Sequence, residues 1–240
     1  MNTTSTTALL TNMGSALPDI SMTLQIFDEG IVNVRWTWAS QPNGKRTPRD
    51  LPQDIINTEP RAVPAGLYLS KYITLSDPTA PFQVNFRSVN TNDKVPLLTL
   101  SGLLFDEFVN KMELQLNTPK DTNFTGIFGL GERANTNFFY PDGVYTTYAS
   151  DHGTPDEDGK PPSKGMYGVH PFFVYQHADA SWVGVFSKVM QATDYWVKNY
   201  QSQGQISVKS TAIGGIGDLY VLIDRQTPES VVSQYYKVIG

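Results

Sequence analysis

The chain has 240 residues, of which 40 % are hydrophobic and 12 % aromatic, and its formal net charge is −5. This composition indicates an ordered globular chain, long enough for one large all-β domain or two small ones. The negative charge and the lack of any Lys/Arg cluster argue against nucleic acid and anionic membranes as partners. The sequence contains no cysteine, which excludes disulfides, a thiolate nucleophile and a zinc site built on sulfur. We expect no cofactor and no bound metal.

Residues 1–20 are rich in threonine and have neither a basic start nor a continuous apolar stretch. They do not resemble a secretory signal, and we expect a flexible N-terminal segment before a domain at 21–240. No run of about 18 apolar residues occurs, so no membrane-spanning helix is expected. N-glycosylation triplets occur at Asn2 and Asn123, a pattern that also arises by chance, and glycosylation there stays open.

The first clear structural signal is a hairpin. Apolar and polar residues alternate at 22–26 and again at 32–38, on either side of the turn residues 28–30. Strict alternation predicts two strands with one buried face. Residues 40–66 then hold prolines at 42, 48, 52, 60 and 64, which predicts a long surface loop.

Short apolar runs separated by turn residues continue along the chain. They lie at 68–69, 72–75, 82–86, 97–100, 112–116, 172–175, 182–186, 195–197, 206–208 and 219–223. So many short strands predict an all-β fold, an antiparallel two-sheet sandwich, in a single domain.

One short helix is predicted at the C-terminal end. Thr227 suits the N-cap, Pro228 the first helical position and Glu229 the first turn. An apolar stripe follows, and Gly240 suits the position after the helix. The stripe consists of Val231, Tyr235, Val238 and Ile239. A natural terminus and a cut between two domains would both give this ending.

The densest set of unusual residues lies between 126 and 218. The series reads GLGER at 129–133, FFYPDG at 138–143, YTTYASD at 145–151 and MYGVHPFF at 166–173. It continues with GVF at 184–186, DYW at 194–196, GGIGDLY at 214–220 and TPE at 227–229. Each piece is weak alone, but the ordered series is specific.

This series resembles the N-terminal domain of glycoside hydrolase family 31, the α-glucosidase family, over about residues 20–240. The resemblance implies a galactose-mutarotase-like β-sandwich that precedes a catalytic (β/α)8 barrel in the same parent protein. In that family both catalytic aspartates belong to the barrel, so we expect no catalytic residue here. It also suggests a secretory, lysosomal, vacuolar or extracellular compartment, although this sequence shows no signal peptide.

The resemblance further implies a loop that leans over the barrel mouth, from which one aspartate binds the hydroxyls of an α-glucoside or malto-oligosaccharide. By position that residue is Asp151, and an ionised carboxylate is a strong hydrogen-bond acceptor. Tyr148 and Tyr145 are the nearest aromatic candidates for stacking on sugar rings. The alternatives are an aspartate that caps its own turn and tyrosines that pack in the core or an interface.

Three neighbouring features also have two interpretations each. Residues 156–159 look like a fragment of a calcium loop, but the full ligand spacing is missing and a solvated acidic loop is favoured. His170 suits an acid or a ligand, and a hydrogen-bonded structural role is favoured. Glu132 and Arg133 favour an ion pair that holds a turn between sheets over a catalytic role.

From this resemblance we expect the chain to serve as a non-catalytic domain of an α-glucosidase-like hydrolase. It would contribute a substrate-contacting loop and a docking face for the barrel. Alone, the chain is expected to lack hydrolase activity. The alternatives are a free-standing carbohydrate-binding module and an aldose mutarotase. The mutarotase needs an acid and a base at one anomeric centre, and only His152, His170 and His177 are available as histidines.

Overall fold

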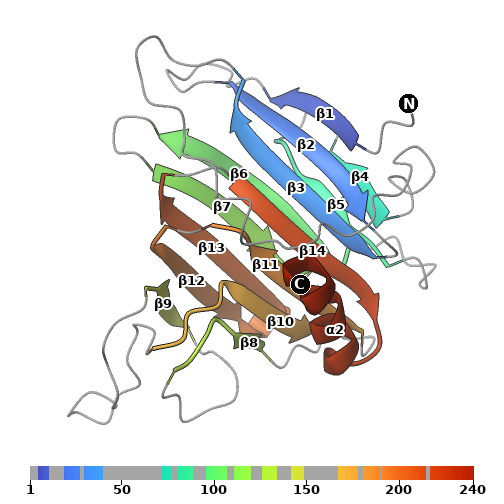
Figure 1. The fold of residues 1–240 in the computed structure, drawn as a ribbon, viewed down its shortest axis with the longest axis vertical. Helices are drawn as coiled ribbons and strands as arrows, with labels where there is room; N and C mark the ends of the chain where they lie inside the picture. Colours follow the sequence, from blue (N-terminus) through green and yellow to red (C-terminus); the bar gives the residue numbers. More distant parts are fainter. Residues whose placement is uncertain are drawn as a thin grey trace.

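Two antiparallel sheets stack face to face, and one α-helix covers the outer face of the first sheet (Figure 1). The computed structural model describes residues 5–10, 19–27, 30–39, 72–76, 81–88, 96–106, 111–119, 126–133, 142–148, 167–177, 181–189, 191–214 and 217–240. The predicted all-β sandwich with a short C-terminal helix is confirmed. The expected proline-rich loop at 40–66, the run at 68–69, the acidic loop at 156–159, Asn2 and Asn123 lie outside the described residues.

The first sheet joins the N-terminal hairpin to strands from the last third of the chain. Its order is β1 (Ser5–Leu10), β2 (Ile20–Phe27), β3 (Ile31–Trp38), β14 (Gly217–Arg225), β11 (Trp182–Ser187), β10 (Phe172–Gln176) and β8 (Ile127–Gly129). The predicted hairpin is confirmed as β2 and β3. The last strand of the chain, β14, lies between β3 and β11 and connects the two halves of the sheet.

The second sheet holds the strands from the middle of the chain. Its order is β4 (Ile73–Leu75), β5 (Val84–Phe86), β6 (Leu98–Asp106), β7 (Lys111–Asn117), β13 (Gln205–Ile213), β12 (Thr193–Tyr200) and β9 (Gly143–Thr147). A short 3-10 helix, η2 (Gln201–Gln203), links β12 to β13. At one end of this sheet, β9 pairs with β12.

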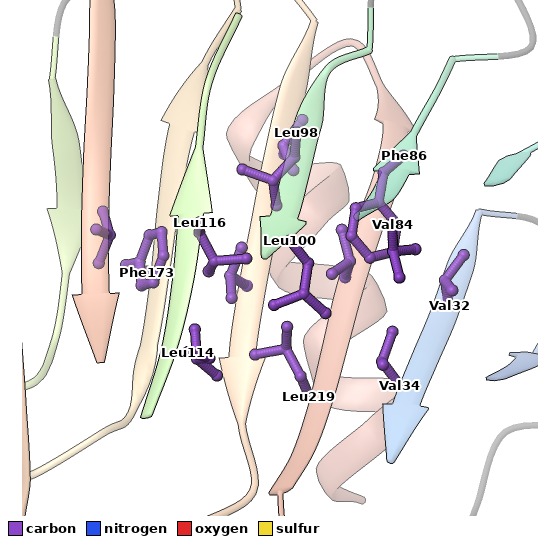
Figure 2. Close-up of a cluster of buried hydrophobic side chains, with 14 of the residues drawn as sticks. Val32, Val34, Val84, Phe86, Leu98, Leu100, Leu114, Leu116, Phe173 and Leu219 are labelled. Carbon is purple, nitrogen blue, oxygen red and sulfur yellow. The ribbon is translucent and has the colours of Figure 1, made fainter. Parts of the chain in front are cut away.

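The core forms where the inner faces of the two sheets meet (Figure 2). Along β7 the buried positions Met112, Leu114 and Leu116 alternate with partly exposed ones, as expected for a strand with one buried face. Figure 2 shows Leu114 and Leu116 together with Val34 and Leu219 of the opposite sheet. Alternating apolar residues from both sheets therefore supply one continuous core.

The helix α2 (Pro228–Ile239) begins and ends as its sequence predicts. The Thr227 hydroxyl accepts a hydrogen bond from the Ser230 N–H at 3.2 Å, and the Gly240 N–H donates to the Tyr236 carbonyl at 2.9 Å. The side chains of Val231 and Val238 are buried against the outer face of the first sheet. Because this sheet is covered on both faces, residues 219–223 of β14 are all buried. No helix in the described part of the chain has the length and apolarity needed to cross a membrane.

The N-terminal segment differs from the expectation for residues 1–20. Residues 5–10 form β1, which pairs with β2 from Ser5 opposite Gln25 to Leu10 opposite Ile20. Threonine is β-branched and favours extended backbone, and β2 offers an unpaired edge. Residues 5–10 therefore add an edge strand to the first sheet, and residues 1–4 and 11–18 lie outside the described part of the chain.

Candidate functional site

The GLGER segment forms a sharp turn directly after β8. Gly129, Leu130 and Gly131 all have positive φ angles, of 122°, 58° and 86°. A Cβ on Gly131 would lie 2.5 Å from the Gly168 carbonyl oxygen, and one on Gly129 would lie 2.5 Å from the Phe172 carbonyl oxygen. Glycine is required at both positions because the backbone is left-handed and a second backbone segment lies against it.

That second backbone segment is the YGVHPF stretch. The Glu132 N–H donates to the Gly168 carbonyl at 2.7 Å, and the Gly168 N–H donates to Glu132 Oε2 at 3.1 Å. The Leu130 N–H donates to the Phe172 carbonyl at 2.7 Å. The GLGER and YGVHPF segments, which lie apart in the sequence, are therefore joined by backbone hydrogen bonds. The Glu132 carboxylate takes part in this junction by accepting from the Gly168 N–H.

Arg133 connects this turn with the second sheet. Its Nε donates to the Leu130 carbonyl at 3.2 Å and its Nη2 donates to the Thr146 carbonyl in β9 at 2.6 Å. Its Cζ lies 5.6 Å from the centre of the Tyr145 ring, within the range of a cation–π contact. The Glu132 side chain thus binds the turn to the backbone at Gly168, and the Arg133 side chain binds it to the backbone of β9 in the second sheet.

The two tyrosines that the sequence nominates for sugar binding differ in exposure. Tyr145 is only 7 % exposed and faces the core, so its ring presents no open face for stacking and its position favours the packing interpretation. Tyr148 follows the end of β9 and is 59 % exposed. Asp151 lies outside the described residues. Its role in sugar binding therefore stays a prediction.

Two hydrogen bonds fix the end of β9 just before Tyr148. The Thr146 hydroxyl donates to Asp194 Oδ1 at 2.5 Å, and the Thr147 hydroxyl donates to the Thr193 carbonyl at 3.1 Å. Asp194 belongs to the DYW segment, which sequence reasoning listed without a role. The chain therefore reaches Tyr148 from a well-held strand.

A cavity of about 580 Å³ opens beside Tyr148. Four segments supply its walls: the end of β9, the residues before β10, the stretch from the end of β11 to 192, and α2. The lining residues are Thr147, Tyr148, Val169, His170, Pro171, Phe186, Ser187, Lys188, Val189, Gln191, Ala192, Tyr235 and Ile239. Mostly apolar walls with a few polar groups are typical of binding sites.

The helix wall of the cavity is fixed by aromatic packing. The Tyr235 ring stacks on Phe172 with centroids 4.2 Å apart and meets Phe186 edge-on at 5.1 Å. Burial raises the pKa of Tyr235 above its ordinary value. Its hydroxyl therefore stays protonated near neutral pH.

The described lining residues of the cavity supply hydroxyl, amide, imidazole and ammonium groups. Among the described residues that line it, none is a carboxylate. Retaining hydrolysis of a glycoside needs two carboxyl groups about 5–5.5 Å apart. The described residues also contain no cluster of three or more potential metal-ligating side chains.

The two described histidines lie at opposite ends of β10. His170 precedes β10 and lines the cavity, whereas His177 follows β10 at its other end. At a strand rise of about 3.3 Å per residue, this span separates the two backbones by roughly 20 Å. They cannot act on one anomeric centre, which counts against the mutarotase hypothesis. His152 lies outside the described residues.

Two further motif aspartates have structural contacts. Asp142, at the start of β9, accepts hydrogen bonds from Lys198 Nζ and from the Asn199 N–H, the latter at 2.7 Å. These bonds hold the pKa of Asp142 below its ordinary value. Asp218 is buried in β14 and accepts a hydrogen bond from Asn33 Nδ2 of β3 at 2.6 Å. The hydrogen bond between Asn33 and Asp218 was not predicted from the sequence.

Comparisons with known proteins were made at the level of families, sequences and structures. No family profile matches the chain. A probable maltase-glucoamylase 2 of Homo sapiens is 29 % identical over 201 residues, which cover 83 % of this chain and 7 % of that protein. Glucoamylase 1 of Schwanniomyces occidentalis is 29 % identical over 65 % of this chain and 15 % of its own length. A lysosomal acid α-glucosidase of Tetrahymena pyriformis is 26 % identical over 48 % of this chain and 12 % of its own.

The chain is a relative of the family 31 glycoside hydrolases. It spans less than a sixth of the length of these curated relatives, and its length is consistent with the N-terminal domain of family 31 enzymes. The motif segments on which the resemblance rested include the two that contact each other at Gly168 and Glu132.

Solved structures share the fold. The glucosidase II α subunit superposes with a TM-score of 0.73 at 13 % identity, over 98 % of this chain and 32 % of that chain. A family 31 dextranase of Flavobacterium johnsoniae gives a TM-score of 0.63 at 14 % identity, over 98 % of this chain and 27 % of its own. At such identities the likeness concerns the fold alone.

Proposed function

We propose that the chain acts as the non-catalytic N-terminal domain of an α-glucosidase-like glycoside hydrolase. In this role it contributes a substrate-contacting loop, which starts after β9, and a docking face for a catalytic (β/α)8 barrel. The observation that carries the proposal is the position of the cavity. It lies between the end of β9, where the loop begins, and the helix α2, which precedes the barrel in the family that this chain resembles.

The docking face is supported by exposed aromatic side chains. Tyr148 and Tyr167 are 59 % and 58 % exposed, and Tyr236 on α2 is 60 % exposed. Aromatic residues are enriched in the buried centres of protein interfaces. We assign the cavity and the exposed rings near it to contact with the barrel and the substrate.

The substrate contact is assigned to Asp151 and Tyr148. A carboxylate that accepts from sugar hydroxyls fixes the orientation of the ring, and an exposed tyrosine can stack on its apolar face. Tyr145 supports the strand from the core. The substrate class is an α-glucoside or malto-oligosaccharide.

The first test measures hydrolysis of a nitrophenyl α-glucoside by the purified chain. We expect no turnover, because the resemblance assigns both catalytic aspartates to the barrel. Turnover that follows the protein through successive purification steps would contradict a non-catalytic role.

The second test follows the reading frame beyond the codon of Gly240. We expect it to continue into a barrel of about 250 residues, the typical size of that fold. In the longer product, Asp151→Asn should lower kcat/KM by roughly tenfold, the effect of losing a hydrogen bond to a charged group. Asp142→Asn is the matched control, because its carboxylate contacts Lys198 and Asn199 of β12. A stop codon directly after Gly240 would refute the proposal.

A free-standing carbohydrate-binding module is the second candidate, favoured by the exposed ring of Tyr148 at a cavity of about 580 Å³. Titration calorimetry of the chain with maltose and glucose separates the two. Millimolar or tighter binding that is lost in Asp151→Ala would favour the module. No heat with either sugar would favour the domain that needs its barrel.

A further inference from the structure

The outer face of the second sheet carries an exposed tryptophan. Along β12 the side chains of Trp196 and Tyr200 point outward, whereas Tyr195 and Val197 between them are buried. Trp196 is 50 % exposed and Tyr200 is 41 % exposed. Tryptophan is highly buried on average in folded proteins. A half-open indole in the middle of a strand therefore points to a contact that the chain does not make with itself.

The groups beside this indole are polar and held in place. In the register of the sheet Trp196 lies opposite Lys209 of β13, which lies opposite Gln115 of β7. Gln115 Nε2 donates to the Ser207 hydroxyl at 3.0 Å and to Asn117 Oδ1 at 3.2 Å. These bonds fix two amide side chains about 10 Å from the indole, at the usual spacing between strands. Side chains that are already ordered cost a ligand less to bind.

The charges on this face and at its edge balance one another. They belong to three lysines and three carboxylates: Lys111, Lys198, Lys209, Glu113, Asp142 and Asp194. Glu113 is held by Lys111 and Lys209 at 2.6 and 2.9 Å, and Asp142 is held by Lys198. A surface whose charges neutralise one another lacks the field that attracts a polyanion or an acidic protein. This favours an uncharged ligand.

The mixture of an indole with amide and ammonium groups suits a sugar better than a protein. The buried centres of protein interfaces are depleted in charged residues, whereas here Lys209 lies directly opposite Trp196. A sugar ring has an apolar face of C–H groups and a rim of hydroxyls that donate and accept hydrogen bonds. An indole can cover the apolar face, and amides and ammonium groups can bond the rim.

We propose that the outer face of the second sheet around Trp196 binds a neutral oligosaccharide chain. The indole stacks on one sugar ring, and Lys209, Gln115 and Asn117 bond hydroxyls of the chain. Tyr200 lies four residues along β12 from Trp196, about 13 Å at the rise of a strand, so several sugars are needed to reach both rings. None of these residues is among the described residues that line the cavity, so this is a second surface. The choice of an α-glucan as the chain rests on the proposed function.

Affinity electrophoresis of the whole chain, in native gels that contain soluble starch, tests the proposal. We expect starch to retard the chain, and Trp196→Ala to raise the apparent Kd by roughly tenfold, the loss of one stacking contact. Trp196→Phe keeps a flat ring and should restore most of the binding. Gln115→Leu removes the amide at similar size and should raise the apparent Kd by roughly fivefold, the loss of a hydrogen bond.

Tyr236→Ala is the matched control, because Tyr236 is an aromatic residue of similar exposure, 60 %, on the helix that covers the other sheet. Its apparent Kd for starch should equal that of the unmutated chain. The thermal midpoints of the Trp196 and Tyr236 variants should stay close to that of the unmutated chain, since both positions are exposed. Equal losses of binding in Trp196→Ala and Tyr236→Ala, or no retardation of the unmutated chain, would overturn the proposal.

Three further measurements separate other occupants of this face. Retardation by hydroxyethylcellulose but not by starch would refute an α-glucan as the ligand. Binding that is abolished by high salt would identify a charge contact and overturn a neutral ligand. A dimer in sedimentation velocity that forms without sugar and is lost in Trp196→Ala would assign the face to a second copy of the chain, and would also overturn the proposal.

This inference and the proposed function fail separately. Hydrolysis of a nitrophenyl α-glucoside by the longer product of the reading frame, without retardation by starch, would refute the sugar-binding face and leave the proposed function standing. Retardation that depends on Trp196, together with a stop codon directly after Gly240, would confirm the face and refute the barrel partner.

Discussion

Gly217 lies directly against the indole ring of Trp36, its cross-strand partner in β3, and a Cβ on Gly217 would come within 1.9 Å of Trp36 Cε2. Trp36 is buried and cannot turn away without disturbing the core. Gly217→Ala should therefore lower the free energy of unfolding by about 2–3 kcal/mol, as overpacking does. Urea denaturation measures this change.

Gly143→Ala is the control for that substitution. Gly143 is exposed in β9, and the nearest atom to an added Cβ is the Tyr145 hydroxyl oxygen at 3.4 Å. Its effect should stay within about 0.5 kcal/mol. Equal effects at the two positions would show that the ring of Trp36 does not lie against Gly217.

A buried hydrogen bond connects the two sheets. The Tyr175 hydroxyl in β10 donates to the Leu97 carbonyl next to β6 at 2.8 Å. Tyr175→Phe keeps the ring but leaves that carbonyl without this donor, and should cost about 1–2 kcal/mol of unfolding free energy. Tyr167→Phe, at an exposed position, should have no measurable effect in the same denaturation assay.

The stability of the chain should depend on pH through Glu113. Partial burial acts to raise the pKa of Glu113, but hydrogen bonds from Lys111 and Lys209, at 2.6 and 2.9 Å, outweigh it and hold the pKa below its ordinary value of 4.5. The carboxylate therefore stabilises the fold above pH 4.5, and this contribution is lost as the pH falls through the lowered folded-state pKa.

Glu113→Gln tests that dependence. At pH 7 it should reduce the free energy of unfolding by less than about 1 kcal/mol, because both lysines are partly exposed and solvent screens the pair. The difference from the unmutated chain should shrink at pH 3 and in high salt. A difference of the same size at pH 7 and pH 3 would contradict the assignment.

The cap of α2 offers a fourth test. Thr227→Ala removes the acceptor of the Ser230 N–H and should cost about 1 kcal/mol. Thr227→Ser keeps the hydroxyl and should restore most of that loss in thermal unfolding. If alanine and serine behave alike, the cap contributes nothing.

Local signals made much of the fold predictable. Strict alternation located the β2–β3 hairpin and β7, and the chemistry of Thr227, Pro228 and Gly240 located α2, because each depends on a few neighbouring residues. The strands β1, β8 and β9 were not predicted. Residues 5–10 lack a clear apolar alternation, and β8 is three residues long with glycine at its end.

The candidate site depends more on contacts between distant segments. Alternation along β9 places the side chains of Tyr145 and Thr147 on one face of the strand and that of Thr146 on the other. This pattern alone does not say which of the two faces points into the core. The bond between Asn33 and Asp218 joins residues 185 positions apart. The cavity likewise combines β9, the end of β11 and α2, so no sequence window contains it.

The central place of β14 has a consequence for the order in which the protein can be completed. Until residues 217–225 leave the ribosome, β3 and β11 each present an unpaired edge, and the outer face of the first sheet has no helix over it. Contacts between such distant segments form slowly, and open strand edges attract other chains. A product that ends before β14 would therefore be expected to aggregate, because β14 closes the gap between β3 and β11 and α2 covers the outer face of the first sheet.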